Sequence, residues 1–408
     1  MRVLNVSAQK PDSTGSGTYL SELVRAQVTA GHETAVLCGA APGDAQELLP
    51  AQTAVYTVPF ETPELPFRIC GMSDVMPYPS TRYRDLTPAM LDAFERAFSA
   101  RIAEALRDFG PDLVICHHLY LVCALVREAA CDVPVLAVCH STDIRQMETH
   151  ALERRRIIGA VRKLDGICAL HEEQAAEIAR VYGVDPARVH VVGTGYDRHQ
   201  FFCDPLVERV PGALVYVGKI CIKKGVLSFA HALARLAPDV SRQVAVTLVG
   251  GHGDEAEYDE IARAAEEAPC PVELAGRLDQ AALVRAYQSS EVFVLPSFFE
   301  GLPLVAIEAI ACGCKVVMTD LPGVRPWMET VLPGAPVTWV EPPRMLEIDT
   351  PDPAALDAFE ERLARAVERA LASPLAVCDT RAVSWDACSE RILDVARPHL
   401  PSRLDSFD

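Results

Sequence analysis

Residues 296–314 read PSFFEGLPLVAIEAIACGC and follow a short apolar run, Val292–Leu295. The apolar run is typical of a buried strand, and the Gly and Pro that follow Glu300 are typical of a tight loop. Pro303 stands where a helix would begin, and Gly313 stands where it would end. The stretch therefore predicts a strand, a loop and one short helix, which is the repeating unit of a parallel α/β sheet.

Two carboxylates bracket the start of this predicted helix, Glu300 on the loop and Glu308 within the helix. The first amides of a helix have no partner within it and lie at the positive end of its dipole, so they suit a phosphate. Carboxylates instead accept hydrogen bonds from hydroxyl groups. Amides between two acids therefore suit a nucleotide-sugar, with its diphosphate in the middle and its sugar and ribose hydroxyls on either side.

Length and composition limit the classes of protein to consider. The 408 residues favour two domains, and the net charge of −18 argues against nucleic acid or anionic lipid as a partner. Neither end resembles a secretory signal and no apolar run has the length of a membrane span, so we expect a cytoplasmic protein. The 14 cysteines are scattered without a CxxC pair, which predicts reduced thiols and no metal site.

Strands and helices alternate along the chain, which predicts two Rossmann-like doubly wound domains facing a cleft. The first would span residues 1–205 and be completed by a C-terminal helix at about 385–408, and the second would span residues 206–384. Residues 9–17 are expected to form a Gly-rich loop after the first strand. Its Gly15-Ser16-Gly17 would let a ligand approach the backbone, although a tight strand-to-helix turn remains the alternative.

Lysine is concentrated in one loop. Only six of the 38 basic residues are Lys, and three of them, Lys219, Lys223 and Lys224, follow the strand predicted at residues 213–217. Ammonium groups can stabilise a leaving diphosphate without a metal ion. The loop therefore predicts a reaction that releases a nucleoside diphosphate.

Histidines follow two predicted strands of the first domain, His118 after residues 111–116 and His140 after residues 133–138. Ligands of open α/β sheets bind at the carboxyl ends of the strands, so His140 is expected in the site, whereas a structural histidine is the alternative. Arg82 and Tyr83 lie in a Pro-rich segment and could hold an anionic acceptor, with a solvated loop as the alternative.

Together these motifs resemble the family 4 retaining glycosyltransferases of the GT-B fold. The resemblance rests on the Gly-rich turn, on His140, on Val217-Gly218-Lys219 with Lys224-Gly225, and on Glu300 and Glu308 at the spacing Glu-x7-Glu. It implies a hexosyltransferase that moves a sugar from a nucleotide-diphosphate sugar, a UDP-sugar, to an acceptor. The leaving phosphate would take the acceptor's proton, and the resemblance implies no metal and no cofactor.

The resemblance also implies roles for individual residues. The catalytic group would comprise His140, Lys219, Lys224 and Glu300. The donor would contact Gly15, Ser16, Gly17, Gly218, Arg277, Leu278, Phe299, Gly301, Leu302, Pro303, Leu304 and Glu308. The resemblance does not fix the acceptor contacts, and the residues expected there are His118, Arg82, Tyr83, Thr142 and Asp143.

The segment His140–Ile144 is similar to that of the bacillithiol-pathway transferase that glycosylates malate, which has Gly where this chain has Ser141. This similarity favours a small soluble acceptor. Two other functions remain open on the sequence alone. One is a nucleotide-sugar epimerase or hydrolase of the same fold, and the other is a non-catalytic nucleotide-sugar-binding protein.

Overall fold

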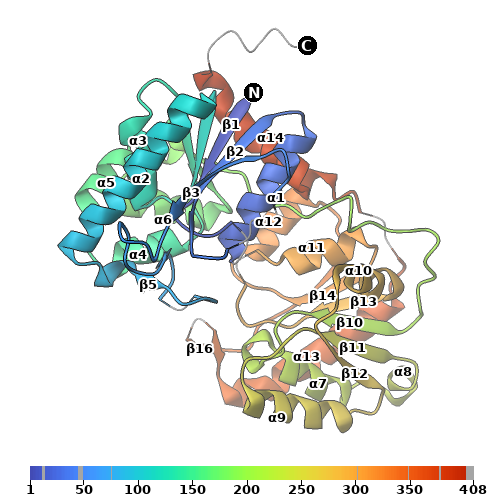
Figure 1. Cartoon of the computed structure of the whole chain (residues 1–408). Coiled ribbons are helices and arrows are strands. Elements are labelled where there is room, and N and C mark those ends of the chain that lie inside the picture. Colours follow the sequence, from blue (N-terminus) through green and yellow to red (C-terminus); the bar gives the residue numbers. More distant parts are fainter. Residues whose placement is uncertain are drawn as a thin grey trace. The chain divides into compact units, whose positions relative to one another are not determined.

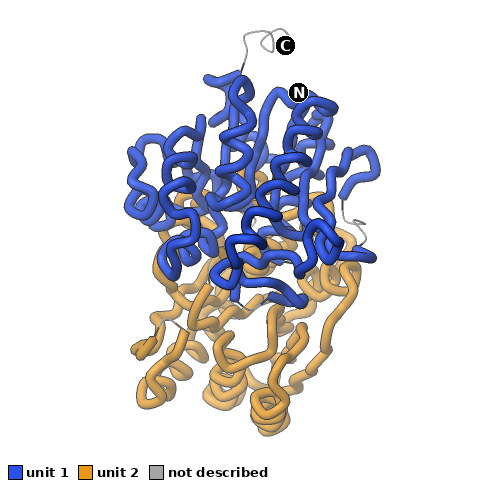
Figure 2. The backbone as a smooth tube through the Cα atoms, turned by 60° about the vertical axis from the view of Figure 1, so that its left-hand side comes forward, with its two compact units in different colours: residues 1–194, 385–408 blue, residues 195–384 orange. Residues whose placement is uncertain are grey.

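The computed structural model describes residues 1–11, 14–44, 49–74, 76–300, 302–347, 349–375 and 378–400 (Figure 1). The chain divides into two compact units, which Figure 2 shows in different colours. Unit 1 comprises residues 1–194 together with the chain from Trp385 onward, and unit 2 comprises residues 195–384. Each unit is built on one parallel sheet.

The sheet of unit 1 has the strand order β3-β2-β1-β6-β7-β8-β9, and all of its neighbouring strands are parallel. Its strands are β1 (Arg2–Val6), β2 (Glu33–Ala40), β3 (Ala54–Pro59), β6 (Leu113–His117), β7 (Val135–Val138), β8 (Gly166–Ala169) and β9 (Val189–Val191). A separate pair joins β4 (Cys70–Gly71) to β5 (Thr81–Arg82). The strand order reverses between β1 and β6, and such a switch point is where open α/β sheets bind ligands.

Helices cover both faces of this sheet, because its strands bury side chains on both sides. The helices of unit 1 are α1 (Gly15–Thr29), α2 (Pro88–Phe109), α3 (Leu121–Ala129), α4 (Thr142–Thr149), α5 (Arg154–Val161), α6 (Glu172–Tyr182) and α14 (Trp385–Ala396). One face packs against α2, α3, α5 and α6, and the other packs against α1 and α14. Short 3-10 turns lie at Tyr83–Asp85, Pro186–Arg188 and Arg397–His399.

Local sequence accounts for the longest helix of unit 1. Thr87 caps α2 by accepting a hydrogen bond from the Met90 amide, and Pro88 occupies its first turn. Gly110 ends the helix in the left-handed conformation that glycine favours. Local sequence therefore determines where α2 begins and where it ends.

The sheet of unit 2 has the order β12-β11-β10-β13-β14-β15, again with parallel neighbours and a switch point, here between β10 and β13. Its strands are β10 (Ala213–Val217), β11 (Ala245–Val249), β12 (Val272–Gly276), β13 (Val292–Leu295), β14 (Lys315–Thr319) and β15 (Val337–Val340), with a hairpin of β16 (Met345–Glu347) and β17 (Thr350–Pro351). Its helices are α7 (Val226–Leu233), α8 (Pro238–Ser241), α9 (Glu255–Glu266), α10 (Gln280–Ser289), α11 (Leu304–Ala311), α12 (Val324–Val331) and α13 (Pro353–Ala372), and 3-10 turns lie at Ile222–Lys224 and Arg381–Val383.

The predicted α/β fold with two doubly wound domains is confirmed, but unit 2 begins eleven residues before the predicted position 206, at Gly195. The segment after Thr194 packs on unit 2, because Phe201 is buried in the core of that unit and the Val210 amide donates to the Ser289 carbonyl. The segment between Thr194 and β10 therefore belongs to the second unit.

The first loop of the chain is shorter than predicted. Residues 15–17 form the first turn of α1 and are not part of a loop, and Thr14 caps this turn by accepting from the Gly17 amide at 3.1 Å. A side-chain cap satisfies an amide that would otherwise lack a partner, so the helix can begin in spite of two glycines. The predicted tight strand-to-helix connection is closer to the structure than the predicted loop.

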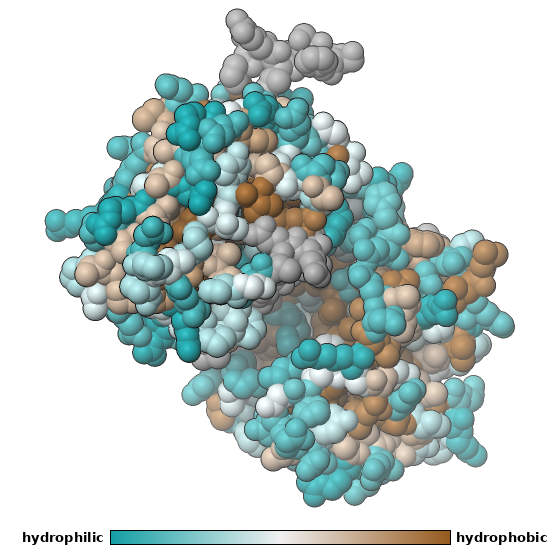
Figure 3. Space-filling model, in the orientation of Figure 1, coloured by the Kyte–Doolittle hydropathy of each residue, from teal (hydrophilic) through white to brown (hydrophobic). Residues whose placement is uncertain are grey.

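In Figure 3 hydrophilic residues dominate the visible face of each unit, with smaller apolar areas between them. Across the described ranges, no helix combines the length and apolar character that crossing a bilayer requires. All 14 cysteines are free thiols.

Candidate active site

The loops at the carboxyl edge of the unit 2 sheet carry most of the predicted donor residues. Lys219 and Lys224 follow β10, Arg277 follows β12, and Glu300 follows β13. These strands are neighbours through β11, so their loops lie side by side at the switch point. The strand order thus gathers residues that are up to 81 positions apart.

Lys224 and Glu300 form an ion pair, with 2.7 Å between the Lys224 Nζ and the Glu300 Oε1. The Ser297 hydroxyl donates to the same oxygen, also at 2.7 Å. The Glu300 side chain is 14% exposed and that of Lys224 is 32% exposed. Because both donors use Oε1, the carboxylate is oriented with Oε2 outside these two bonds. Oε2 is thus the oxygen able to accept from a sugar hydroxyl.

A glycine allows these two loops to meet. Gly225 has a φ of +68°, and a Cβ at this position would lie 2.0 Å from the carbonyl oxygen of Pro296. No other residue fits both the left-handed backbone and this close approach. Gly225 therefore brings the lysine loop against the segment that holds Ser297 and Glu300.

Two further glycines give room to basic side chains. Atoms of Arg277 lie 2.6 Å from the position of a Cβ on Gly251, and the Lys219 Nζ lies 3.0 Å from that of a Cβ on Gly253. The side chains of Lys219 and Arg277 thus pack against the backbone of the loop after β11. These glycines were not among the predicted site residues, because a Gly-rich strand end looks like any turn in the sequence.

Helix α11 is confirmed as the short helix of the opening stretch, with Pro303 at its N-cap and Gly313 after its end at a φ of +89°. No side chain caps its first turn. Phe299 is exposed, Leu302 and Leu304 are partly buried, and Gly301 lies outside the described residues. The amides of Leu304 and Ala306 already donate to the carbonyls of Leu302 and Pro303, both at 3.0 Å. The helix start therefore offers an anion chiefly the positive end of its dipole.

Glu308 accepts a hydrogen bond from the hydroxyl of Tyr287 on α10, at 3.3 Å. Burial raises the pKa of Tyr287 well above its usual value, and the nearby Glu308 charge raises it further, so the hydroxyl stays protonated and remains a donor. Tyr287 orients Glu308 much as Ser297 orients Glu300. Neither was predicted, because one Tyr on an amphipathic helix and one buried Ser give no signal of their own.

The remaining predicted donor residues of unit 2 lie close by in the chain. Gly218 ends the turn after β10 with a φ of +158°, and its carbonyl would collide with a Cβ on Gly250. Leu278 follows Arg277 and is partly buried against the core of the unit. Arg277 is exposed, so it is free to contact a ligand at the sheet edge.

The carboxyl edge of the unit 1 sheet carries a cluster of three histidines. His117 is the last residue of β6, His118 follows it, and His140 follows the neighbouring β7. The rings of His117 and His140 stack at 5.5 Å, with 3.3 Å between Nδ1 of His117 and Nε2 of His140. The His118 ring centre lies 4.9 Å from that of His140. The predicted position of His140 at a strand end of the switch region is therefore the observed one.

All three imidazoles favour the neutral form. Burial lowers the pKa of His117 to about 3, and the neighbouring His118 adds to the effect. Burial also lowers the pKa of His140 well below its usual value, helped by His118 and His117. The pKa of His118 is lowered by burial as well, partly offset by the charge of Asp143. At neutral pH the cluster thus offers ring nitrogens that donate or accept without carrying charge.

His118 is the most unusual member of this cluster. It is only 3% exposed, and neither ring nitrogen has a partner at hydrogen-bonding geometry. Its backbone has a φ of +80°, which is rare for a residue other than glycine. Strain and an unpaired buried group together are typical of functional sites.

Asp143 links the loops that follow β6 and β7 through its hydrogen bonds. Its Oδ2 accepts from the Leu119 amide at 2.8 Å, and its Oδ1 accepts from the His140 amide and the Cys139 thiol, both at 3.2 Å. The side chain is fully buried. The predicted acceptor contact of Asp143 is therefore not accessible, because both of its oxygens are occupied by loop groups.

Ser141 explains a difference seen in the sequence. It has a φ of +67° at the start of α4, a conformation that glycine adopts at no steric cost. Gln174 donates to the Ser141 hydroxyl at 2.7 Å and holds the loop. Gly at this position in the bacillithiol-pathway transferase thus fits the same backbone. Thr142, a predicted acceptor contact, is partly buried as the first residue of α4.

Other predicted residues of unit 1 differ in their surroundings. Gly15 is exposed with open space around it, and the Ser16 hydroxyl donates to Gln9 at 3.3 Å. Tyr83 is 1% exposed and packs against Phe94 and Tyr120 in the core, so it is not a surface contact for a ligand. The exposed Arg82 pairs with Asp85.

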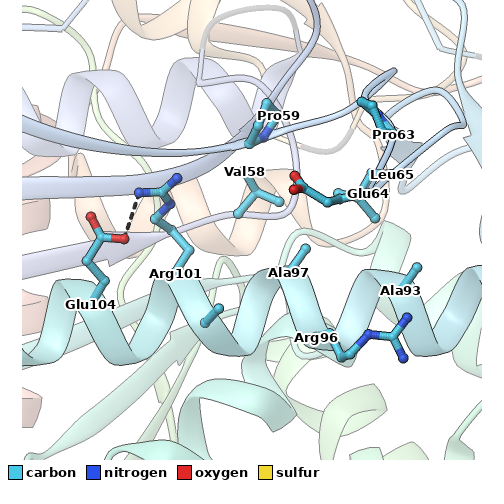
Figure 4. A pocket seen from close by; sticks show the side chains of 11 residues that line it. Val58, Pro59, Pro63, Glu64, Leu65, Ala93, Arg96, Ala97, Arg101 and Glu104 are labelled. Carbon is cyan, nitrogen blue, oxygen red and sulfur yellow. Dashed lines mark hydrogen bonds and ion pairs between the residues drawn. The ribbon is translucent and has the colours of Figure 1, made fainter.

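A cavity of about 500 Å³ lies elsewhere on unit 1, between α2 and the segment after β3 (Figure 4). Ala93, Ala97 and Ala100 form its floor on one face of α2. Its arginines already have partners, as Arg101 pairs with Glu104 and Arg96 pairs with Asp92. None of the predicted site residues lines this cavity, so it is not the candidate active site. No group of three or more metal-ligating side chains occurs in the part of the chain that the structure describes.

Known proteins share both the sequence and the fold. A family model described as Glycosyltransferase Family 4 matches residues 13–200, and one described as Glycosyl transferases group 1 matches residues 211–344. The chain is 26% identical over 401 residues to "Glycogen synthase" of Mycobacterium tuberculosis, covering 91% of each protein. It is 25% identical over 415 residues to "D-inositol 3-phosphate glycosyltransferase" of Xylanimonas cellulosilytica, covering 94% of this chain and 91% of that protein.

The solved structure of Anabaena Alr3699/HepE in complex with UDP superposes with a TM-score of 0.61 at 15% identity, covering 98% of this chain and all of the other. This likeness concerns the fold. The two family models and the full-length relatives concern the same two units that carry the lysine loop, the paired acids and the histidine cluster. The chain therefore belongs to the glycosyltransferases of the GT-B fold.

Proposed function

We propose that this protein transfers a sugar from a UDP-sugar to a small acceptor that carries an anionic group, with retention of the anomeric configuration. The observation that carries the proposal is the arrangement of Lys224, Ser297 and Glu300 beside the start of α11, which no side chain caps. It combines positive charge for a diphosphate with a carboxylate already oriented for a hydroxyl. A neighbour solved in complex with UDP supports the choice of nucleotide.

In this proposal unit 2 binds the donor. Lys219, Lys224 and the positive end of the α11 dipole hold the diphosphate, since all three supply positive charge. Glu308, oriented by Tyr287, accepts from the ribose hydroxyls. Glu300 accepts from a hydroxyl of the donor sugar through Oε2.

The proposed reaction is a displacement on one face of the sugar. The bond from the anomeric carbon to the β-phosphate oxygen breaks, and a bond from that carbon to the acceptor oxygen forms on the same face. The acceptor's proton passes to the leaving phosphate oxygen, which gives UDP and the glycoside. Lys219 and Lys224 stabilise the negative charge that develops on the leaving group, so the proposal assigns this role to no metal.

The acceptor is proposed to bind at the histidine cluster of unit 1. Helices α3 and α4 both start at this edge without a side-chain cap, and the unpaired imidazole of His118 lies between their loops. Helix starts and neutral N–H donors suit a carboxylate or a phosphate. The named substrate of the Xylanimonas relative, D-inositol 3-phosphate, carries such a group.

A matrix of donors and acceptors tests the proposal. UDP-glucose, UDP-N-acetylglucosamine, GDP-mannose and ADP-glucose are each incubated with malate, inositol 3-phosphate or free inositol, and nucleotide release and product configuration are measured. We expect release from a UDP-sugar only with an anionic acceptor, an α-glycoside by NMR, and no loss of rate with EDTA. Release without any acceptor would indicate a hydrolase, and tight binding without release would indicate a binding protein.

A further inference from the structure

Tyr19 on α1 contacts the candidate catalytic imidazole of unit 1. It is 5% exposed, and its ring meets that of His140 edge-on, with 5.0 Å between ring centres and 78° between planes. A second edge-on contact joins it to Trp385, at 4.9 Å and 85°. Edge-to-face packing is a favourable aromatic geometry, so Tyr19 is a fitted neighbour of both rings.

The hydroxyl of Tyr19 contacts a third segment. It donates to the Gly193 carbonyl at 3.1 Å and lies 3.1 Å from the Cys388 sulfur. Burial, followed by the nearby Cys388, raises the pKa of Tyr19 well above its usual value, so the hydroxyl remains a donor at neutral pH. The ring is thus held at its edge and at its tip, which leaves it little freedom to rotate.

These contacts lie where the chain changes units. Unit 1 ends its first part at Thr194, one residue after Gly193, and resumes at Trp385. Arg391 on α14 adds a bond to the carbonyl of Val192, at 2.8 Å. Tyr19 therefore touches the segment by which the chain leaves unit 1, the residue by which it returns, and His140.

We propose that Tyr19 is a positioning residue. It holds the His140 imidazole in place relative to the two crossing segments, which are the chain around Gly193, where it leaves unit 1, and around Trp385, where it returns. The inference rests on the proposed function, in which the histidine cluster that includes His140 binds the acceptor. A shift of either crossing segment moves the Tyr19 ring, and the ring moves His140. Small misplacements of reacting groups can lower a rate by up to about a hundredfold, so the contact matters for turnover.

Four variants test this inference in the full-length protein. Tyr19→Leu removes the ring, Tyr19→Phe removes only the hydroxyl, and Trp385→Leu removes the support behind Tyr19 without touching His140. Leu20→Ala is the matched control, because Leu20 is fully buried on the same helix but packs in a different cluster, with Val24, Val36 and Cys38. The readouts are kcat, the KM for the donor, UDP affinity, Tm, and the NMR signal of the His140 ring.

We expect Tyr19→Leu to shift the His140 signal and to lower kcat by about ten- to a hundredfold, with UDP affinity unchanged. Trp385→Leu should shift the same signal, with a smaller loss of kcat. Tyr19→Phe should keep the signal near that of the wild type, because the ring remains. Leu20→Ala should lower Tm without moving the signal or kcat.

Two outcomes would overturn the inference. One is a His140 signal that Tyr19→Leu and Trp385→Leu leave in place, and the other is a loss of kcat in Leu20→Ala that matches that of Tyr19→Leu. If Tyr19→Leu does not fold, Trp385→Leu decides by the same signal. If the wild-type protein releases no nucleotide, the proposed function fails, whereas the NMR signal still decides whether Tyr19 positions His140.

Discussion

The carboxyl ends of the strands meet at a switch point in both sheets, but the side chains there are neutral in unit 1 and charged in unit 2. Each edge lies at a switch point of a parallel sheet with helices on both faces. Unit 1 places there three imidazoles that favour the neutral form, of which His117 and His118 are buried and His140 is partly buried. Unit 2 places there ammonium groups and carboxylates that are partly exposed. Shared topology thus determines where each site lies, and the loop residues determine its chemistry.

The difference follows from what each edge is proposed to bind. A diphosphate carries more charge than neutral donors can balance, so it requires Lys219 and Lys224. A charged lysine tolerates burial poorly, which fits the partial exposure of Lys224. Neutral imidazoles tolerate burial and can still donate to an acceptor's anionic group. Each prediction below tests one side of this contrast.

The largest loss of kcat is expected from replacing Lys224, at the charged sheet edge of unit 2. Lys224→Ala should lower kcat by about 10²- to 10³-fold, because a preorganised charge is lost from the leaving group. Lys223→Ala is the matched control in the same loop, since Lys223 is 62% exposed and pairs with Asp349. Steady-state kinetics with the identified donor measure both. Equal losses in the two variants would mean that the loop acts through its overall charge, not through Lys224.

The stability of unit 1 should depend on pH through its histidine cluster. His117 stays neutral in the folded state down to a pKa of about 3, whereas in the unfolded chain it takes up a proton below about pH 6.5. The unfolded state then binds more protons, so stability must fall as the pH falls. For His117 alone the loss at pH 5.5 is about 1.4 kcal/mol, and the lowered pKa values of His118 and His140 act in the same direction.

Urea unfolding at pH 7.5 and pH 5.5 measures this loss. Trp385 reports on unit 1 when Trp327 and Trp339 of unit 2 are replaced by Phe. The three histidines of unit 2, His199, His231 and His252, are exposed, so its transition should move less. A unit 1 transition that stays in place at pH 5.5 would contradict a buried neutral cluster.

The smallest effect is expected from replacing Glu308, the proposed contact of the ribose, and it concerns UDP affinity. Glu308→Ala should weaken UDP binding by about five- to tenfold, because one charged acceptor of hydroxyl hydrogen bonds is removed. Tyr287→Phe keeps the carboxylate and removes only the bond that orients it, so its effect should be smaller. Isothermal titration with UDP and with free uracil separates the contributions, since uracil lacks the ribose. Unchanged UDP affinity in Glu308→Ala would place the ribose elsewhere.

Much of the candidate site could be predicted because its residues follow strand ends. Lys219, Lys224, Glu300 and His140 each lie in the loop that follows an apolar strand, and polar residues in such loops are visible in the sequence. The residues that orient them were not predicted. Ser297, Tyr287 and Tyr19 act through contacts across 3, 21 and 121 positions of the chain, to Glu300, Glu308 and His140.

Some predicted residues have other roles in the structure. Asp143 looked like a ligand contact because it follows His140 near a strand end, yet both of its oxygens hold loop groups. Tyr83 looked exposed because its neighbours are polar and Pro-rich, yet its ring is in the core. The composition of a loop does not show which of its side chains are buried.

The sequence by itself determined that this protein has two α/β sheets, with short Gly-containing loops after their strands and with lysines, acids and histidines in those loops. Hydrophobic runs and helix ends are local features, so they can be seen without tertiary structure. Only the tertiary structure decided which oxygen of Glu300 is already bonded, that His118 is buried without a partner, and that Tyr19 joins His140 to the crossing segments. Such facts depend on side chains that meet from distant parts of the chain, and packing alone determines which of them meet.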